Sequence, residues 1–451
     1  MNNTHAEDYQ MITNRIDRRN FFRTSSAAAL ALASVGMPGI GQGQQAEKPL
    51  KVGFIGVGGR GTVLLRLAMQ LDWVEIPAIC DINERNLGRA QRLVERRGQP
   101  LPAGYGDGPE DFRRMLEERD DLDAVIIGTP WVWHVPMCLA AMEAGVYTGV
   151  EVPAAQDIDE CWQLVETCEK TGTPLMMLEN YAYFRSAMMV MNLLDQGLFG
   201  ELLHCAVGYQ KDERGVRIGP NGELSFYAEA RSKFDGNLYP THAIGPAAWA
   251  MGINRGDRFD YLVSVSSRSV QTEKLIKDRF GPDHPAAKID FVAGDINTSI
   301  IRTAGGSTVT VYYDTQSPRP WDPILRFQGD KGIFMGSIDK IYIEGISQAN
   351  RAYEDAGPYY EKYDHPLWKK WGSLDVAHLG RGVSDFLAVQ QFLEAARRKA
   401  PTPLNVYDAV AWSALTPLSI ESVARGSAPA KFPEFSGGRW QEKQDRIYYG
   451  I

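Results

Sequence analysis

The chain has 451 residues, a net charge of −8 and 44% hydrophobic residues, so it is long enough to need more than one hydrophobic core. The acidic balance and the lack of a sustained basic stripe argue against nucleic acid as a partner. The five cysteines show no metal-site spacing, and no metal is predicted.

The first 47 residues have the pattern of an export signal. Arg18-Arg19 is followed by Phe21-Phe22 and by an alanine-rich apolar stretch that is too short for a permanent membrane anchor. This arginine pair is typical of the twin-arginine export route. We therefore expect the twin-arginine machinery as a partner, no membrane anchor, and a periplasmic or secreted protein. A disordered basic tail is the alternative interpretation.

A nucleotide-binding pattern follows, within a first domain predicted to span residues 48–183. A β-branched run begins at Leu50 and breaks into Gly56-x-Gly58-x-x-Gly61, and Asp81 follows the last glycine by twenty residues at the end of a second apolar run. Such glycines let the backbone approach a pyrophosphate at a helix N-terminus. The acidic residue binds the ribose hydroxyls and repels a 2′-phosphate, so NAD is favoured over NADP.

Three later apolar runs end in polar or aromatic residues. The run 124–128 leads to Trp131-Val132-Trp133-His134, the run 145–150 leads to Glu151, and the run 174–178 leads to Glu179-Asn180. Helical patterns separate the runs. This alternation predicts an α/β fold with a doubly wound, parallel Rossmann sheet whose ligands lie at the carboxyl ends of the strands.

The pattern changes after residue 184. Period-two or β-branched runs predict strands at 202–209, 261–270, 298–303, 308–314, 324–328 and 341–344. We expect an α+β domain over residues 184–372 with an open, mostly antiparallel sheet. Residues 373–451 are predicted to form helices, one of them over 406–423, and a tail that packs back on the two domains.

Particular strings extend this interpretation to a family. Tyr239-Pro240-Thr241-His242, Glu151-Val152-Pro153 and a Y-D-H-P-L-W-K-K string at 363–370 resemble glycoside hydrolase family 109. Those enzymes are NAD-dependent α-N-acetylgalactosaminidases within the superfamily of glucose-fructose oxidoreductase and inositol dehydrogenase. Val152 replaces the lysine that ordinary dehydrogenases of this superfamily carry in an E-K-P motif. The usual base for a simple dehydrogenation is therefore missing, as it is in family 109.

The resemblance also implies site residues. Besides the fingerprint glycines and Asp81, the cofactor is expected against Gly59, Arg60, Trp131, Trp133, His134, Glu151, Val152 and Asn180. The sugar is expected against Tyr209, Arg231, Tyr239, Pro240, Thr241, His242 and Trp321. His242 is predicted to exchange a proton at the C3 hydroxyl, and Tyr183 is predicted to be the base at C2, with a pKa lowered by a nearby positive charge. Which of the two handles which proton stays open, and packing roles are the alternative for both.

The reaction that follows is hydrolysis without net redox change. C3 is oxidised, the C1 substituent is eliminated across C1–C2, water adds, and the ketone is reduced again. The NAD is regenerated in each turnover and is expected to stay tightly bound, which suits an exported protein. Trp321 stands where a tyrosine is expected, so the exact sugar stays open. The alternatives are an exported sugar oxidoreductase that resembles glucose-fructose oxidoreductase, and a non-catalytic carbohydrate-binding protein. A homodimer or larger homo-oligomer is the expectation for the superfamily.

Overall fold

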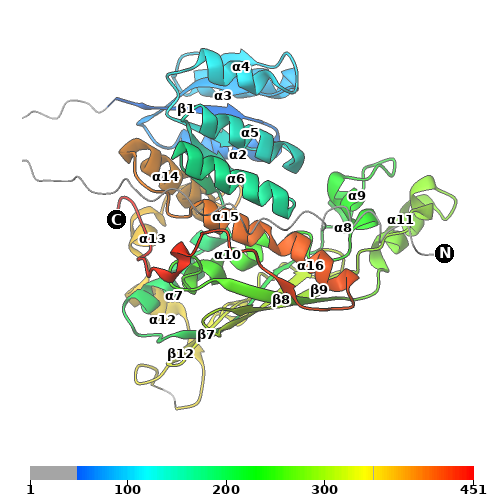
Figure 1. The fold of residues 1–451 in the computed structure, drawn as a ribbon, viewed down its shortest axis with the longest axis vertical. Helices are drawn as coiled ribbons and strands as arrows, with labels where there is room; N and C mark the ends of the chain where they lie inside the picture. The colour runs from blue at the N-terminus through cyan, green and yellow to red at the C-terminus, as the bar shows by residue number, and fades with distance from the viewer. Residues whose placement is uncertain (1–47, 349) are drawn as a thin grey trace, which may run out of the picture. The chain divides into compact units, whose positions relative to one another are not determined.

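The computed structural model describes residues 48–348 and 350–451, so the predicted export signal lies outside the described residues. Two sheets organise this part of the chain (Figure 1). The described residues belong to a single compact unit, and the domain boundaries at 183 and 372 stay predictions.

The first sheet is the predicted Rossmann sheet. Its six strands lie in the order β3-β2-β1-β4-β5-β6, and every neighbouring pair is parallel. All four residues of β4 are buried because helices cover both faces of the sheet. The strands are β1 (Leu50–Ile55), β2 (Val74–Cys80), β3 (Ala103–Tyr105), β4 (Ala124–Ile127), β5 (Tyr147–Val150) and β6 (Leu175–Met177). The helices are α2 (Gly59–Ala68), α3 (Glu84–Arg96), α4 (Asp111–Glu118), α5 (His134–Glu143) and α6 (Ile158–Thr171).

The second sheet confirms the predicted open, mostly antiparallel architecture. Its nine strands lie in the order β14-β13-β12-β11-β7-β10-β9-β8-β15, and only β7 and β10 pair in parallel. The strands are β7 (Leu202–Gln210), β8 (Phe259–Ser266), β9 (Ile296–Thr303), β10 (Thr308–Asp314), β11 (Leu325–Gly329), β12 (Gly332–Met335), β13 (Lys340–Ile343), β14 (Glu354–Asp355) and β15 (Ala430–Lys431). The sequence analysis missed β12, β14 and β15 here and β3 in the first sheet. Strands of two to four residues carry little pattern, and of those in the second sheet only β13 was predicted.

One predicted strand is shorter than expected. β8 ends at Ser266, whereas the prediction extended it to residue 270. The carboxylate of Asp295 accepts hydrogen bonds from the backbone amides of Val270 and Gln271, at the start of α11 (Gln271–Phe280). These capping bonds turn the chain into a helix before the strand can continue.

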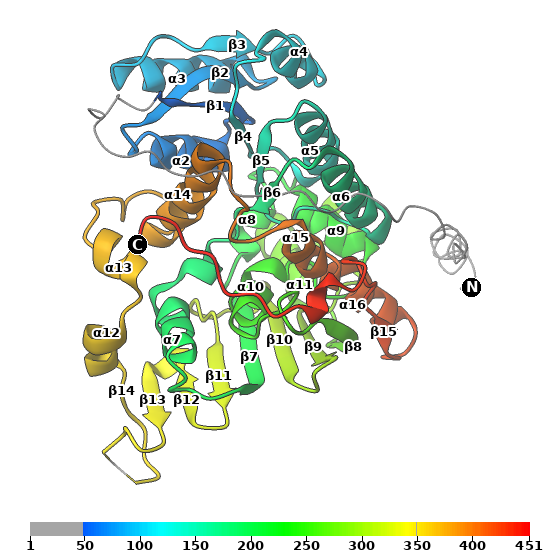
Figure 2. The same ribbon diagram turned by 60° about the vertical axis from the view of Figure 1, so that its left-hand side comes forward.

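Helices fill the space between the two sheets, and Figure 2 shows α10, α15 and α16 in that position. α10 (Thr241–Ala250) lies on β7, α15 (Val406–Ser413) lies against α6, and α16 (Leu415–Ala424) lies on β8. α14 (Val383–Arg398) returns to α2 of the Rossmann part. The C-terminal segment therefore contacts both sheets.

The helix predicted over residues 406–423 is two helices. α15 ends at Ser413 and α16 begins at Leu415. Pro417 has no N–H to donate to the carbonyl of Ser413, four residues earlier, so a continuous helix cannot pass this point undistorted. No helix in the described part of the chain is long and apolar enough to cross a membrane.

Candidate active site

The turn between β1 and α2 is shaped by its glycines. Gly56 has φ +82°, and a Cβ atom on Gly61 would lie 1.9 Å from the carbonyl oxygen of Gly56. A Cβ on Gly59, by contrast, would meet nothing within 4 Å, so the outer side of the turn is open. The helix begins at Gly59 without a side-chain cap, which leaves backbone amides available to an anion such as a pyrophosphate.

A crevice of about 320 Å³ lies beside this turn, at the carboxyl ends of β1, β2 and β4. Gly56, Gly58, Asp81 and Trp133 line it, as the sequence analysis expected for the cofactor. The Asp81 carboxylate is held in place because it accepts hydrogen bonds from the amides of Val57 and Asn83, each at 2.8 Å. The crevice thus fits the adenosine half of a dinucleotide, with Asp81 placed to accept hydrogen bonds from ribose hydroxyls.

Replacing Asp81 by alanine is expected to weaken NAD binding about tenfold or more, because hydrogen bonds to a charged acceptor are lost. Binding of NADP should weaken much less, since the charge that repels its 2′-phosphate is removed at the same time. Titration of nucleotide-free protein with each dinucleotide measures both effects. Equal losses for the two nucleotides would contradict this role of Asp81.

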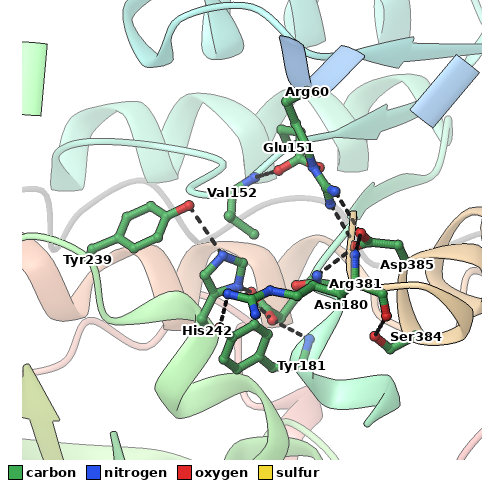
Figure 3. A network of polar contacts seen from close by, with 11 residues as sticks. Arg60, Glu151, Val152, Asn180, Tyr181, Tyr239, His242, Arg381, Ser384 and Asp385 are labelled. Atoms are coloured by element: carbon green, nitrogen blue, oxygen red, sulfur yellow. Dashed lines mark hydrogen bonds and ion pairs between the residues drawn. The ribbon is translucent and has the colours of Figure 1, made fainter. Parts of the chain in front are cut away.

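A charged network begins at Arg60, in the first turn of α2, and joins three parts of the chain (Figure 3). Arg60 donates to the Glu151 carboxylate at 2.7 Å and bidentately to the Asp385 carboxylate of α14 at 2.8 and 2.9 Å. Asp385 also accepts hydrogen bonds from the Asn180 side chain at 2.6 Å and from the backbone amide of Arg381 at 2.6 Å. The network ties the cofactor turn to the ends of β5 and β6 and to the C-terminal helices.

The electrostatics of this network keep its members charged. Burial raises the pKa of Asp385, but the adjacent Arg60 guanidinium outweighs burial and the net shift is downward. Burial lowers the pKa of Arg60, and the two carboxylates raise it by more. Arg60 therefore bridges the carboxylate that follows β5 and the carboxylate of α14.

The Oδ1 atom of Asn180 is an unusual feature of the same network. It is buried and has no hydrogen-bond partner in the described part of the chain. A buried acceptor without a donor costs free energy of folding. A ligand that donates an amide hydrogen bond to this atom would therefore be stabilised here. The nicotinamide carboxamide is such a donor. With the open turn and the crevice, these residues fit NAD, which would supply a hydride acceptor at this end of the site.

His242 lies at the start of α10, and both of its ring nitrogens have partners. Nδ1 is 2.8 Å from Oε2 of Glu179, and Nε2 is 3.3 Å from the hydroxyl of Tyr239. Glu179 follows β6, is fully buried, and also accepts the backbone amide of Tyr181 at 2.7 Å. The carboxylate holds the proton on Nδ1, so Nε2 is the nitrogen that can accept a proton.

Aromatic side chains surround His242. The ring of Tyr181 stacks on the imidazole with a centroid distance of 4.5 Å, and the rings of Tyr239 and Tyr209 lie at 5.0 and 5.4 Å. Trp321 meets Tyr181 edge-on at 6.4 Å. The structure therefore brings together four residues predicted to meet the sugar, namely Tyr209, Tyr239, His242 and Trp321.

The hydroxyl of Tyr181 faces two donors. Nη2 of Arg381 lies 3.2 Å from it and Nε1 of Trp321 lies 3.4 Å from it. The Arg381 guanidinium is also within 5.6 Å of the Tyr181 ring and 5.3 Å of the Trp321 ring. Burial raises the pKa of Tyr181 to about 12, and Arg381 opposes this shift.

Trp131 connects the Rossmann part to the sugar side of the site. Its indole stacks on the ring of Tyr239 at 5.5 Å, with 14° between the planes. Phe226 and Tyr227, at the start of α9 (Phe226–Lys233), meet its edges at 5.0 and 4.8 Å. Trp131, which was predicted to contact the cofactor, thus lies where the Rossmann part of the chain meets the aromatic residues on the sugar side of the site.

The prediction of Tyr183 as a base is wrong. Its side chain is fully buried against Trp249 with a centroid distance of 5.2 Å, and its hydroxyl has no hydrogen-bond partner in the described part of the chain. Burial raises its pKa well above the usual value, opposite to the lowered pKa that was expected. In the 3₁₀ turn η2 (Tyr181–Tyr183), side chains two positions apart point in different directions, so Tyr181 occupies the site instead.

Three further residues predicted to contact the sugar are buried. Arg231 is 1% exposed and donates through Nη2 to the carbonyl oxygens of Ala293 and Gly294, so it braces a loop. Its Nε and Nη1 have no partner in the described part of the chain, and its contact with the sugar stays a prediction. Pro240 and Thr241 are buried and serve to place His242 at the start of α10.

His134 is likewise an internal support. Its ring nitrogens lie 2.7 and 2.9 Å from the carbonyl oxygens of Pro153 and Thr129, and burial lowers its pKa. It connects the loops after β4 and β5 and does not reach the cofactor crevice as predicted.

Besides Tyr181, three residues of the site were not predicted. Glu179 stood in a strand-end string and Asp385 was an acidic residue beside the apolar face of its helix, so a buried carboxylate could have been suspected at both. Arg381 follows Gly380 in a segment that no pattern connected to the site. Only the folded chain brings it to Tyr181.

The fold and the site together define an NAD-binding enzyme with an oxidoreductase-like Rossmann domain. The matching family descriptions are "Oxidoreductase family, NAD-binding Rossmann fold" over residues 50–179 and "Glycosyl hydrolase 109, C-terminal domain" over residues 183–442. Among solved structures, levoglucosan dehydrogenase in complex with NADH shares the fold, with a TM-score of 0.65 and 21% identity over 86% of this chain and 100% of that chain.

Curated relatives take the assignment to the family. The α-N-acetylgalactosaminidase of Tannerella forsythia is 40% identical over 463 aligned residues, which cover 95% of this chain and 98% of the relative. A family 109 protein of Solibacter usitatus is 41% identical, and the alignment covers 88% of this chain and 90% of that protein. The chain belongs to glycoside hydrolase family 109, and is an NAD-dependent glycosidase of that type.

Proposed function

We propose that the enzyme hydrolyses α-N-acetylgalactosaminides or related N-acetylhexosaminides without net redox change, with NAD retained between turnovers. The named activity of the Tannerella relative supports this substrate class. Bound NAD would supply the acceptor, and later the donor, of the hydride at C3 of the sugar. The protein groups manage protons and position the sugar.

The observation that carries the proposal is the Glu179–His242 pair at the carboxyl end of the Rossmann sheet. Val152, two residues beyond the neighbouring strand β5, has no proton to exchange, and the imidazole of His242 offers a base at this end of the sheet. Nε2 of His242 takes the proton of the C3 hydroxyl as that carbon is oxidised and gives it back on reduction. The Glu179 carboxylate stabilises the resulting imidazolium.

Tyr181 is the second proton-transfer group in this proposal. Its ring stacks on the imidazole of His242, and its hydroxyl receives hydrogen bonds from Arg381 and Trp321. Both donors stabilise a phenolate, and the positive charge of the guanidinium contributes most to that effect. As a phenolate the group would accept the C2 proton, whose acidity increases once C3 is a ketone.

Replacing Arg381 by methionine is expected to lower kcat. The increase of kcat that accompanies formation of the phenolate should then occur at a higher pH. Removal of the cation leaves burial unopposed, so the pKa of Tyr181 moves further above about 12 and less phenolate forms at any given pH. The pH dependence of kcat for an aryl glycoside, compared with that of Arg381→Lys, measures the shift. An unchanged pH profile in the methionine variant would contradict this role of Arg381.

Isotope exchange tests the proposed reaction. Hydrolysis in D₂O should place deuterium at C2 of the released sugar, and the sugar should keep its oxidation state. A ketosugar or lactone as product would favour the alternative, an exported sugar oxidoreductase. Hydrolysis without any deuterium at C2 would overturn the elimination mechanism.

We further propose that the enzyme is exported by the twin-arginine route with its cofactor already bound. The supporting observation is the Arg18-Arg19 pair before the apolar stretch. Replacing both arginines by lysine should leave the active protein in the cytoplasm, and purified wild-type enzyme should work without added NAD. Continued export of the double lysine variant would refute the route, and a strict need for added NAD would refute retention.

A further inference from the structure

We propose that the buried guanidinium groups of Arg217 and Arg231 together bind a small inorganic anion, such as chloride, next to the sugar side of the site. Arg217 is the last residue of α8 (Arg214–Arg217), and Arg231 lies in α9. The two short helices are neighbours, because the amide of Ser225 at the start of α9 donates to the carbonyl of Arg217 at 2.9 Å. The ion site goes beyond the proposed hydrolysis and does not depend on which sugar is cleaved.

Both guanidinium groups keep hydrogen-bond donors without a partner. Arg217 is 4% exposed and Arg231 is 1% exposed, yet the Nε and Nη1 atoms of each have no hydrogen-bond partner in the described part of the chain. Nη2 is the bonded nitrogen in both residues. It donates to the Glu213 carboxylate in Arg217 and to the carbonyl oxygens of Ala293 and Gly294 in Arg231. Four donor atoms buried on two cations are costly unless a ligand or water accepts from them.

The charges of the pair favour an anion over water. The two arginines form ion pairs with Glu213 and Asp295, and Glu213 also pairs with Lys211 at 2.5 Å. Three cations thus share two carboxylates, and the Asp295 oxygen is 3.8 Å from Nη2 of Arg231, beyond hydrogen-bond distance. Burial and the charge of Arg217 both lower the pKa of Arg231. A bound anion would offset this repulsion between buried cations, which a neutral water molecule cannot do.

Tyr227 connects the arginine pair to the sugar side of the site. The Arg217 guanidinium lies 4.4 Å from the centre of the Tyr227 ring, and this ring meets Trp131 at 4.8 Å and Tyr239 at 5.9 Å. An anion that ties α8 to α9 would therefore also hold Tyr227 against Trp131. Because both arginines are almost inaccessible, a halide or nitrate ion fits this position better than a substituent of the sugar.

Chloride-35 NMR tests the binding. Wild-type protein should broaden the chloride line, and nitrate, as a competing small anion, should reverse the broadening. Arg231→Met removes one guanidinium and should weaken chloride binding about tenfold or more, because charge-assisted hydrogen bonds are lost. Arg214→Met is the matched control, since Arg214 belongs to α8 but pairs with the Asp212 carboxylate at 2.7 Å, and this variant should bind chloride like the wild type. Equal chloride binding by the Arg231 variant and the control, or no broadening by the wild type, would overturn the proposal.

Two further measurements use the wild-type protein. Arg231 was predicted to contact the sugar, so free N-acetylgalactosamine is added to the chloride-bound protein, and the chloride line should stay broad. Displacement of chloride by the sugar would assign the arginines to the sugar instead. Crystals grown in sodium bromide should show an anomalous difference peak between the Arg217 and Arg231 guanidinium groups. Absence of that peak would overturn the proposal, and this measurement decides the question if Arg231→Met does not fold.

Discussion

Replacement of His242 by alanine is expected to lower kcat about 10²- to 10⁴-fold, the usual contribution of a positioned acid–base group. The variant loses Nε2, the nitrogen that the Glu179 carboxylate makes available for proton transfer. Bound NAD should be retained, because the residues that line the cofactor crevice do not include His242. Turnover of an aryl α-N-acetylgalactosaminide and the nucleotide absorbance of the purified variant measure the two effects.

Glu179→Gln provides the control for this experiment. The amide can still hold the imidazole but cannot stabilise an imidazolium by charge, so the loss in kcat should be smaller than in His242→Ala. Turnover close to that of the wild type in His242→Ala would remove the imidazole from the mechanism.

Replacement of Asp385 by alanine is expected to have the largest effect on stability. The change leaves Arg60 with one carboxylate partner and removes the acceptor of Asn180 and of the Arg381 amide. Removing one partner of a buried ion pair costs about 3–5 kcal/mol, and the lower end applies because Arg60 is partly exposed. Denaturant unfolding measures the loss of stability.

The same variant should also release its nucleotide. Asp385 holds α14 against the cofactor turn through Arg60, so the turn loses its support from the C-terminal helices. Ser384→Ala is the matched control, since the neighbouring hydroxyl bonds, among the described residues, only to the carbonyl of Arg381. If Asp385→Ala and Ser384→Ala unfold at the same denaturant concentration and retain equal amounts of NAD, the network does not have the role assigned to it.

The cofactor side of the site was largely predictable because its requirements are local. Gly56 needs a positive φ and Gly61 needs room beside a backbone carbonyl, so glycine is required at both positions wherever the turn occurs. Asp81 follows from the next strand of the same unit. The long strands of both sheets were predicted for a similar reason, since burial imposes a period on each of them.

The proton-transfer side required the folded chain. Tyr181 and Tyr183 are two positions apart in one short turn, and the sequence contains nothing that says which ring will face His242 and which will face Trp249. Arg231 was predicted to meet the sugar, and the sequence does not show that it is buried with its guanidinium bonded to the carbonyl of Ala293. Exposure depends on contacts between distant segments, which a local pattern does not describe.

The amino-acid sequence by itself determined the class of this protein: an NAD-binding Rossmann domain with the motifs of family 109, joined to an open sheet. These features depend on backbone geometry and on the alternation of apolar residues along short segments. The tertiary structure alone decided the partners of the reacting groups, Glu179 for His242, Arg381 for Tyr181 and Asp385 for Arg60. Each pair joins residues far apart in the chain, and their separation is set by how helices and sheets fit together, which no single segment encodes.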